Sequence, residues 1–239
     1  MRRIPWLGLG LCLAGTGCGA ALSNEDPDRS AASLEIVGAG GSMGCGNTNG
    51  SVAVFQNGQM VEGNVYAGVT DTTIQQRKPS ATAATDANCT MKGAWRSAVK
   101  KECLVRWDLS QLPTTTKVGA SCIRLRVLDG SKSPFNAFEM LRAWVDAEAT
   151  WKKATSQEFW ATPGAWGATD SGMEAVATIP NHSIAGRVYE IPLRSALVQK
   201  WVSTPSSNNG LVFAGNGGDG LTIVASEQAD GPALVVGLP

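Results

Sequence analysis

The sequence predicts an all-β protein, a jelly-roll-like β-sandwich with one short helix near residues 193–203. From residue 51 onward, short apolar or alternating runs are separated by turn residues, which is typical of a sandwich or barrel. No alternation of strands with helical runs is visible, so a parallel α/β sheet is not expected. At 239 residues the chain is long enough to build a core that supports itself.

The first residues have the features of a secretory leader, residues 1–17, with a basic start, a short apolar run and a zone of small residues. The apolar run, residues 4–14, is too short to span a bilayer as a helix. Cys18 follows the small residues and resembles the lipid-bearing cysteine of bacterial lipoproteins, although Gly15 stands where those leaders usually carry Leu. We therefore expect export and lipid attachment at Cys18, which would place the protein in the cell envelope as an outer-membrane or cell-surface lipoprotein. The alternative is simple secretion.

Residues 18–50 are rich in Gly, Ser, Asn and Asp and predict a flexible stalk, so residues 51–239 are expected to form the folded domain. The expected strands are 52–55, 64–69, 72–76, 104–109, 123–128, 138–145, 187–191, 210–213, 221–225 and 233–236. The helix is expected after Pro192, a residue that suits a first helical turn. Its apolar residues recur at helical spacing up to Trp201.

Four cysteines remain after the leader and Cys18 are set aside, and an even number in an oxidising compartment indicates two disulfides. In a strand, alternation places Cys103 on the same face as Val105 and Trp107. These neighbours are apolar, so this face is expected to point inward. Cys122 instead shares a face with two arginines, which points outward, so these two should not pair with each other. The preferred pairs are Cys89–Cys103 and Cys45–Cys122, the latter holding the N-terminal tail on the outer face.

An ordered series of motifs resembles the DNRLRE-type domain, a family related to disaggregatase modules and to carbohydrate-binding modules of polysaccharide lyases. Its most specific part is the stretch from Trp144 to Trp151, which is similar to the family's Trp-x-Glu-x-x-x-Thr-Trp signature. The block from Leu104 to Pro113 resembles another family motif, and the resemblance runs from about residue 52 to the C-terminus. Two departures are the acid Asp146 in place of Glu and an apparent insertion at residues 87–101.

Catalytic and zinc chemistry find little support in the sequence. The single histidine, His182, lies in a turn with no nucleophile or orienting acid near it in the sequence, and the cysteines lack C-x-x-C spacing. Lys and Arg balance Asp and Glu at 20 each, so no overall field favours nucleic acid. We therefore expect neither an enzyme nor a nucleic-acid partner.

No cofactor is certain from the sequence, but calcium is the most credible ion because it prefers oxygen ligands. The family resemblance points to Asp71, Asp146 and Glu227 as its ligands. The alternative is that these acids make turn hydrogen bonds or pair with arginines.

Eight tryptophans against two tyrosines is an unusual aromatic mix, and exposed indoles can act as stacking platforms for sugars. Pattern or family position assigns four of them to the core: Trp107, Trp144, Trp151 and Trp201. Three others lie in loop-like sequence and are the candidates for carbohydrate binding, with local packing as the alternative: Trp95, Trp160 and Trp166.

The leading hypothesis is a surface-tethered, non-catalytic, carbohydrate-binding-type module for polysaccharide of the envelope, matrix or environment. The resemblance implies an acidic polysaccharide, and paired basic residues such as Lys100 and Lys101 are compatible with one. The first alternative is a structural coat or matrix protein that binds other proteins. The second is a polysaccharide-cleaving enzyme, for which no pair of catalytic carboxylates is recognisable.

Overall fold

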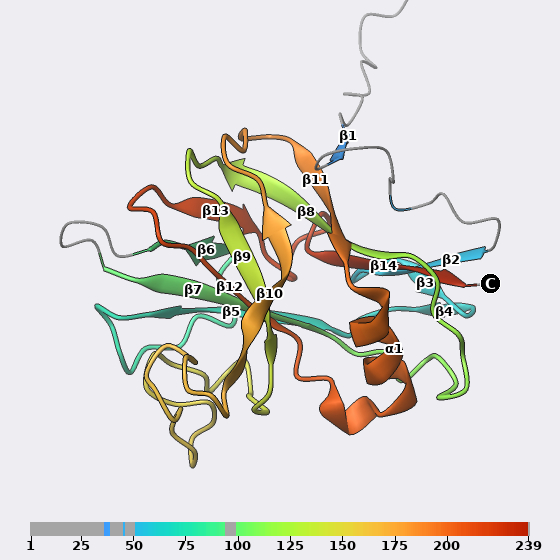
Figure 1. Cartoon of the computed structure of the whole chain (residues 1–239), viewed down its shortest axis with the longest axis horizontal. Coiled ribbons are helices and arrows are strands. Elements are labelled where there is room, and N and C mark those ends of the chain that lie inside the picture. Colours follow the sequence, from blue (N-terminus) through green and yellow to red (C-terminus); the bar gives the residue numbers. More distant parts are fainter. Residues whose placement is uncertain (1–35, 39–44, 46–50, 94–98, 239) are drawn as a thin grey trace, which may run out of the picture. The chain divides into compact units, whose positions relative to one another are not determined.

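Two β-sheets face each other in the computed structural model, which describes residues 36–38, 45, 51–93 and 99–238 (Figure 1). The seven-stranded sheet is formed by β1 (Ile36–Gly38), β2 (Ser51–Phe55), β6 (Asn88–Met91), β8 (Ser121–Asp129), β11 (Val188–Leu193), β13 (Leu221–Val224) and β14 (Ala233–Leu238). The five-stranded sheet is formed by β5 (Val69–Gln75), β7 (Lys101–Trp107), β9 (Phe135–Met140), β10 (Ser171–Ile179) and β12 (Leu211–Ala214). The prediction of an all-β sandwich is confirmed.

The five-stranded sheet has the order β10-β9-β12-β7-β5 and is antiparallel throughout. In the other sheet, β8 is central, because it pairs with β11 on one side and with both β13 and β14 on the other. Strand β2 is added to the outside of β14. A short hairpin of β3 (Met60–Val61) and β4 (Asn64–Val65) stands apart from both sheets.

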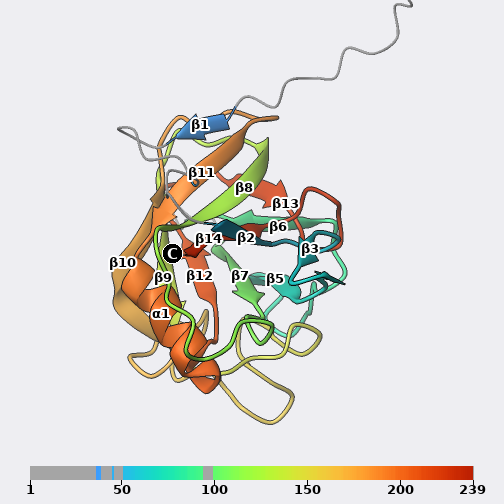
Figure 2. The same ribbon diagram turned by 90° about the vertical axis from the view of Figure 1, so that its right-hand side faces the viewer.

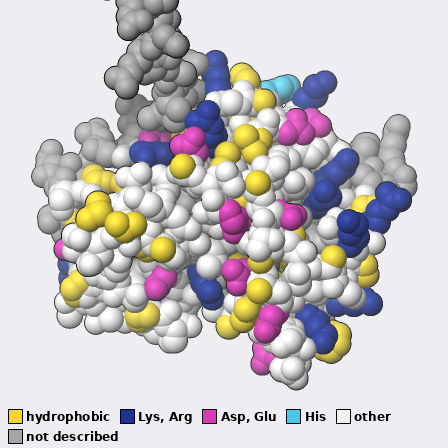
Figure 3. All heavy atoms as spheres, turned by 180° about the vertical axis from the view of Figure 1, so that it is seen from behind, with side chains coloured by type: hydrophobic (Ala, Val, Ile, Leu, Met, Phe, Trp, Pro, Cys, Tyr) yellow, Lys and Arg dark blue, Asp and Glu magenta, His cyan; other side chains and the backbone are white. Residues whose placement is uncertain are grey.

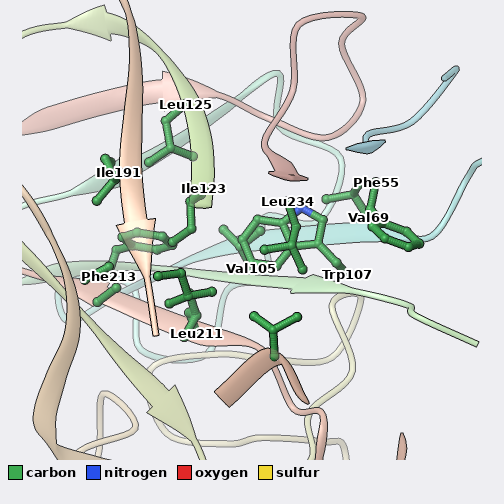
Figure 4. Close-up of a cluster of buried hydrophobic side chains, with 14 of the residues drawn as sticks. Phe55, Val69, Val105, Trp107, Ile123, Leu125, Ile191, Leu211, Phe213 and Leu234 are labelled. Carbon is green, nitrogen blue, oxygen red and sulfur yellow. The ribbon is translucent and has the colours of Figure 1, made fainter. Parts of the chain in front are cut away.

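The main core fills the space between the sheets, where alternate residues of each strand point inward (Figure 4). Val105 and Trp107 of β7 are fully buried there and lie among side chains from the opposite sheet such as Ile123 and Leu234. One end of this core is closed by α1 (Ser195–Ser203), which is followed by the short 3-10 helix η1 (Pro205–Ser207). The α1 side chains that contribute to it are Leu197, Val198, Trp201 and Val202.

The expected helix is present, but its start differs from the prediction. Pro192 lies inside β11 and pairs with Cys122, and the helix begins at Ser195. Pro has no N–H to donate to a neighbouring strand, and β11 accommodates it at this position. Pro192 therefore belongs to the strand and does not mark the first turn of the helix. Four strands were missed: β1, within the expected stalk, β3, β6, within the segment expected as an insertion, and β10.

The two predicted disulfides are present. Cys89 and Cys103, with Cα atoms 5.6 Å apart, join β6 to β7 across the core and so tie the two sheets together. Cys45 and Cys122, with Cα atoms 5.7 Å apart, attach the N-terminal segment to the outward side of β8. Strand β1 also pairs in parallel with β11, so these parts of the expected stalk are bound to the sheet.

A second buried cluster lies on the other side of the five-stranded sheet. The cap segment, residues 141–170 between β9 and β10, folds back over this outer face (Figures 1 and 2). Leu104 and Val212 of the sheet are buried beneath Trp144 and Trp151 of the cap segment. The four tryptophans expected in the core are all buried, at exposures of 7% or less: Trp107, Trp144, Trp151 and Trp201.

Candidate functional site

A groove lies on the outer face of the five-stranded sheet, beside the cap segment, where β9 begins and β12 ends. We call it the Trp166 groove; its volume is about 160 Å³. It is lined by Ser133, Pro134, Asn136, Phe138, Trp166, Ala214, Gly215, Asn216 and Gly217. Among the candidate residues from the sequence, Trp166 is the one that this groove contains.

Trp166 is half-buried and is held in a fixed orientation by contacts on two sides. Its ring meets the ring of Phe138 edge-on, with centroids 5.2 Å apart and an angle of 73° between the planes. Such T-shaped pairs are a favourable arrangement of two aromatic quadrupoles. The indole Nε1 donates a hydrogen bond of 2.6 Å to Oε1 of Glu102 on β7. The groove therefore presents an indole that is already oriented before any ligand arrives.

Glu102 is an unusual partner because it is only 2% exposed. It lies on the outer face of β7, in alternation with Leu104, and the cap segment covers that face. Burial raises the pKa of Glu102 to about 8, although the hydrogen bond from Trp166 and the charge of Lys100 both lower it. Its other oxygen, Oε2, is buried without a hydrogen-bond partner among the described residues. At neutral pH this carboxyl group is mainly protonated and serves as a neutral acceptor for the indole.

Asp170 organises the end of the cap segment that carries Trp166. Its carboxylate is fully buried and accepts hydrogen bonds from the backbone N–H groups of Ala161, Thr162 and Gly167 at 3.0 to 3.1 Å. Arg142 Nε donates to it at 2.7 Å. Burial raises the pKa of Asp170, but these backbone and guanidinium hydrogen bonds outweigh it and leave the pKa below its ordinary value. The charged form of Asp170 thus fixes the turn on which Trp166 stands.

The opposite rim of the groove is a glycine-rich turn after β12. A Cβ atom on Gly215 would lie 2.6 Å from the ring of Phe135, and one on Gly217 would overlap the side chain of Ser133. Only glycine allows this close approach. Beside the groove, Thr178 Oγ1 donates to Asn136 Oδ1 at 2.9 Å, which orients the amide of this lining residue.

The prediction that Trp160 offers an exposed stacking surface is wrong. Trp160 is 4% exposed, and its Nε1 donates to the Thr150 carbonyl at 2.8 Å inside the cluster beneath the cap segment. The flanking Ala and Thr residues looked like a loop in the sequence, but the segment folds back on the sheet and buries the ring. Trp95 lies outside the described residues.

The three acids expected to bind calcium share one electrostatic environment. Asp71 is 2% exposed and accepts a hydrogen bond of 2.5 Å from the Ser226 backbone N–H. Burial raises its pKa to about 7, the Ser226 hydrogen bond lowers it, and the charges of Glu227 and Asp146 raise it further. Within the ranges described by the structure, no three Asp, Glu, His or Cys side chains form a group that could hold a metal ion. The structure thus shows Asp71 as the acceptor of a turn N–H, and the residues that it describes assemble no ready set of calcium ligands.

Basic residues occupy the strand ends near the groove. Lys92 and Lys101 lie opposite each other in a β-bridge, and Lys100 is close enough to Glu102 to affect its pKa. Next to Lys92, Gly93 packs so closely on the groove rim that a Cβ atom there would be 2.6 Å from Asn216. Seen from behind, Lys and Arg side chains concentrate toward one side of the molecule, while acidic ones are scattered (Figure 3).

Several residues of this site carried no signal in the sequence. Glu102 and Asp170 look like ordinary surface acids in the sequence, because their burial depends on how the cap segment folds.

His182 lies in an exposed turn at positive φ, as expected for a turn residue. Cys18, the predicted lipid attachment site, lies outside the described residues.

Comparison with known proteins gave no further guide. No family model matches the chain, and none of the curated proteins matches it. Among the described residues, no helix has the length and apolar character needed to cross a membrane.

Proposed function

We propose that the protein is a non-catalytic, surface-tethered carbohydrate-binding-type module, and that the Trp166 groove is its binding site. The observation that carries the proposal is the fixed indole of Trp166, held by Glu102 on one side and by Phe138 on the other. A ring that is already oriented loses little conformational freedom when a ligand stacks on it, which favours affinity. The resemblance to the DNRLRE-type domain is consistent with this assignment.

The groove offers the two kinds of contact that a sugar ring needs. The indole and the Phe138 ring are apolar surfaces for the C–H face of a sugar, while the wall amides of Asn136 and Asn216 suit its hydroxyl groups. With about 160 Å³ of space, the groove holds part of a chain and leaves the rest outside.

An acidic polysaccharide is the ligand class that the surrounding charges favour. Lys92, Lys100 and Lys101 belong to the strand ends next to Gly93, which packs on the rim, and cations near a binding site attract carboxylate or sulfate groups. Charge attraction at an exposed rim is screened by salt, so affinity should fall as ionic strength rises.

Attachment to the cell surface is the second part of the proposal. The leader and Cys18 support export and lipid attachment. The two disulfides support an oxidising compartment, because such bonds persist in exported proteins and are rare in the cytosol. Palmitate labelling of the full chain, compared with Cys18→Ser, tests the lipid directly.

A glycan array with wild-type protein and the variants Trp166→Phe and Trp166→Ala tests the binding site. We expect binding to acidic polysaccharides that weakens about five- to tenfold in Trp166→Ala, since stacking on an aromatic ring contributes on the order of 1–1.5 kcal/mol. The matched control is Phe159→Ala, which removes an aromatic ring that is 62% exposed and does not line the groove.

Two results would overturn the proposal. If no polysaccharide binds, the structural coat or matrix hypothesis replaces it. If bound polysaccharide is shortened in the same samples, the protein is an enzyme and the non-catalytic assignment fails.

A further inference from the structure

A second cavity opens on the same outer face of the sheet, at the other end of β7. Its volume is about 360 Å³, and its walls come from the strand ends and from the segment around η1. It is lined by Gly68, Thr70, Arg106, Asp108, Leu109, Trp201, Pro205 and Asn208. Arg106 and Glu102 are four residues apart on β7, so this cavity lies about 13 Å along the strand from the Trp166 groove. Trp144 and Trp151 are buried in the cluster on the outer face of the same sheet.

Two buried polar atoms on residues of this cavity have no hydrogen-bond partner among the described residues. They are Thr70 Oγ1 and Trp201 Nε1, and Trp201 is 0% exposed. A buried polar group without a partner costs free energy, so native proteins rarely keep one without a reason. Thr70 lines the cavity, so a ligand oxygen bound there could pair with its hydroxyl.

The charged groups of the cavity are fixed in place before a ligand enters. Arg106 lies directly opposite Thr70 in the sheet, its guanidinium stacks 5.4 Å from the centre of the Trp144 ring, and Nη1 donates to the Trp144 carbonyl. Asp108 is held by two hydrogen bonds from Ser110, of 2.9 and 3.0 Å. A guanidinium and a carboxylate therefore line the same cavity.

The chemistry of these walls selects for a neutral ligand with several hydroxyl groups. A hydroxyl group both donates and accepts, so it can serve Asp108 and Arg106 at once, whereas a carboxylate ligand only accepts and would be repelled by Asp108. Pro205, which is exposed and lines the cavity, provides an apolar surface for the C–H groups of a ring. Ligand cavities usually measure ~300–1,000 Å³, and this one, near the lower limit, suits a single ring.

We propose that this cavity is a second binding site, separate from the Trp166 groove, for one neutral sugar unit. It rests on its own residues and does not require that the Trp166 groove binds polysaccharide.

The test is a titration of the ¹⁵N-labelled full chain with the methyl α-glycosides of glucose, galactose and mannose, followed by NMR. At least one should give a saturable shift of the Trp201 indole signal in the millimolar range. Thr70→Val keeps the shape of the side chain and removes one hydrogen-bonding group, so it should weaken binding about tenfold without lowering the free energy of unfolding. Thr115→Val, in an exposed loop, is the matched control and should bind like wild type.

Three results would overturn this proposal: no saturable shift with any of the glycosides, equal affinity of wild type and Thr70→Val, or tighter binding of glucuronate than of the neutral sugars. The variant Trp166→Ala separates the two sites. If it abolishes the shifts caused by single sugars, those shifts come from the groove and the second site is refuted. If polysaccharides fail to bind while a Thr70-dependent sugar shift remains, the proposed function fails and the second site stands.

Discussion

Replacing Glu102 with Gln should remove a large part of the pH dependence of stability. The pKa of this buried carboxyl group is raised from 4.5 to about 8 in the folded protein, so the native state keeps a proton that the unfolded chain has lost. Between these two values, the free energy of unfolding falls as the pH rises, because deprotonation favours the unfolded state. Below pH 4.5 and above about pH 8, Glu102 no longer changes the free energy of unfolding as the pH changes.

The expected magnitude follows from the width of that interval. Each pH unit changes the free energy of unfolding by ~1.36 kcal/mol for one proton, so the interval from 4.5 to about 8 corresponds to on the order of 5 kcal/mol. Asp71, with a pKa raised from 3.8 to about 7, adds a second slope of the same sign over its own interval. Where the two intervals overlap, wild type should lose stability about twice as steeply as Glu102→Gln.

Urea unfolding at a series of pH values from 4 to 9 measures this. Glutamine can still accept the hydrogen bond from Trp166, and it resembles the protonated acid in charge and shape. The variant should therefore match wild type to within about 1 kcal/mol near pH 5 and exceed it by several kcal/mol near pH 9. Glu174→Gln, on a side chain that is 82% exposed, is the control and should follow wild type. Parallel curves for wild type and Glu102→Gln would refute the reasoning.

The remaining predictions concern the carboxylates and the disulfides. Asp170→Asn should lower the free energy of unfolding by about 2–4 kcal/mol at neutral pH, measured by urea unfolding, since it removes a buried charge with four hydrogen bonds; a change below about 1 kcal/mol would contradict the role given to it. Replacing Cys45 and Cys122 together by Ser should cost about 2–4 kcal/mol, because this bond closes a loop with a sequence separation of 77; unchanged thermal unfolding would count against it. If calcium binds near Asp71, millimolar calcium should raise the melting temperature of wild type relative to a chelator, and Asp71→Asn should abolish that difference; equal melting temperatures would exclude a stabilising ion.

The parts of the fold that depend on local alternation were predictable from the sequence. Alternation predicts that Cys103 points inward and Cys122 outward. This difference correctly assigned the two cysteines to different disulfides. Trp107 was likewise assigned to the core from its place in an alternating run. These features depend on neighbours within one strand, which the sequence displays directly.

The site was less predictable because it depends on how the cap segment packs. Trp160 and Trp166 have similar small and polar neighbours in the sequence, yet one is buried and the other lines the groove. Glu102 looks like the exposed position of a strand, and becomes buried only because residues far along the chain cover it. No short-range pattern encodes such long-range contacts, and a charged residue gives no sign that it will be covered.

The bond between Cys45 and Cys122 also determines how the protein would bear mechanical load. A pull on the N-terminal segment reaches Cys45 and passes through the disulfide to β8, the central strand of its sheet. The chain between the two cysteines, which includes β2 and β5 to β7, is a closed covalent loop and cannot extend when the N-terminal segment is pulled against a ligand held by later parts of the chain. A protein anchored at its N-terminus would therefore keep the strand that carries Glu102 and Arg106 intact under tension.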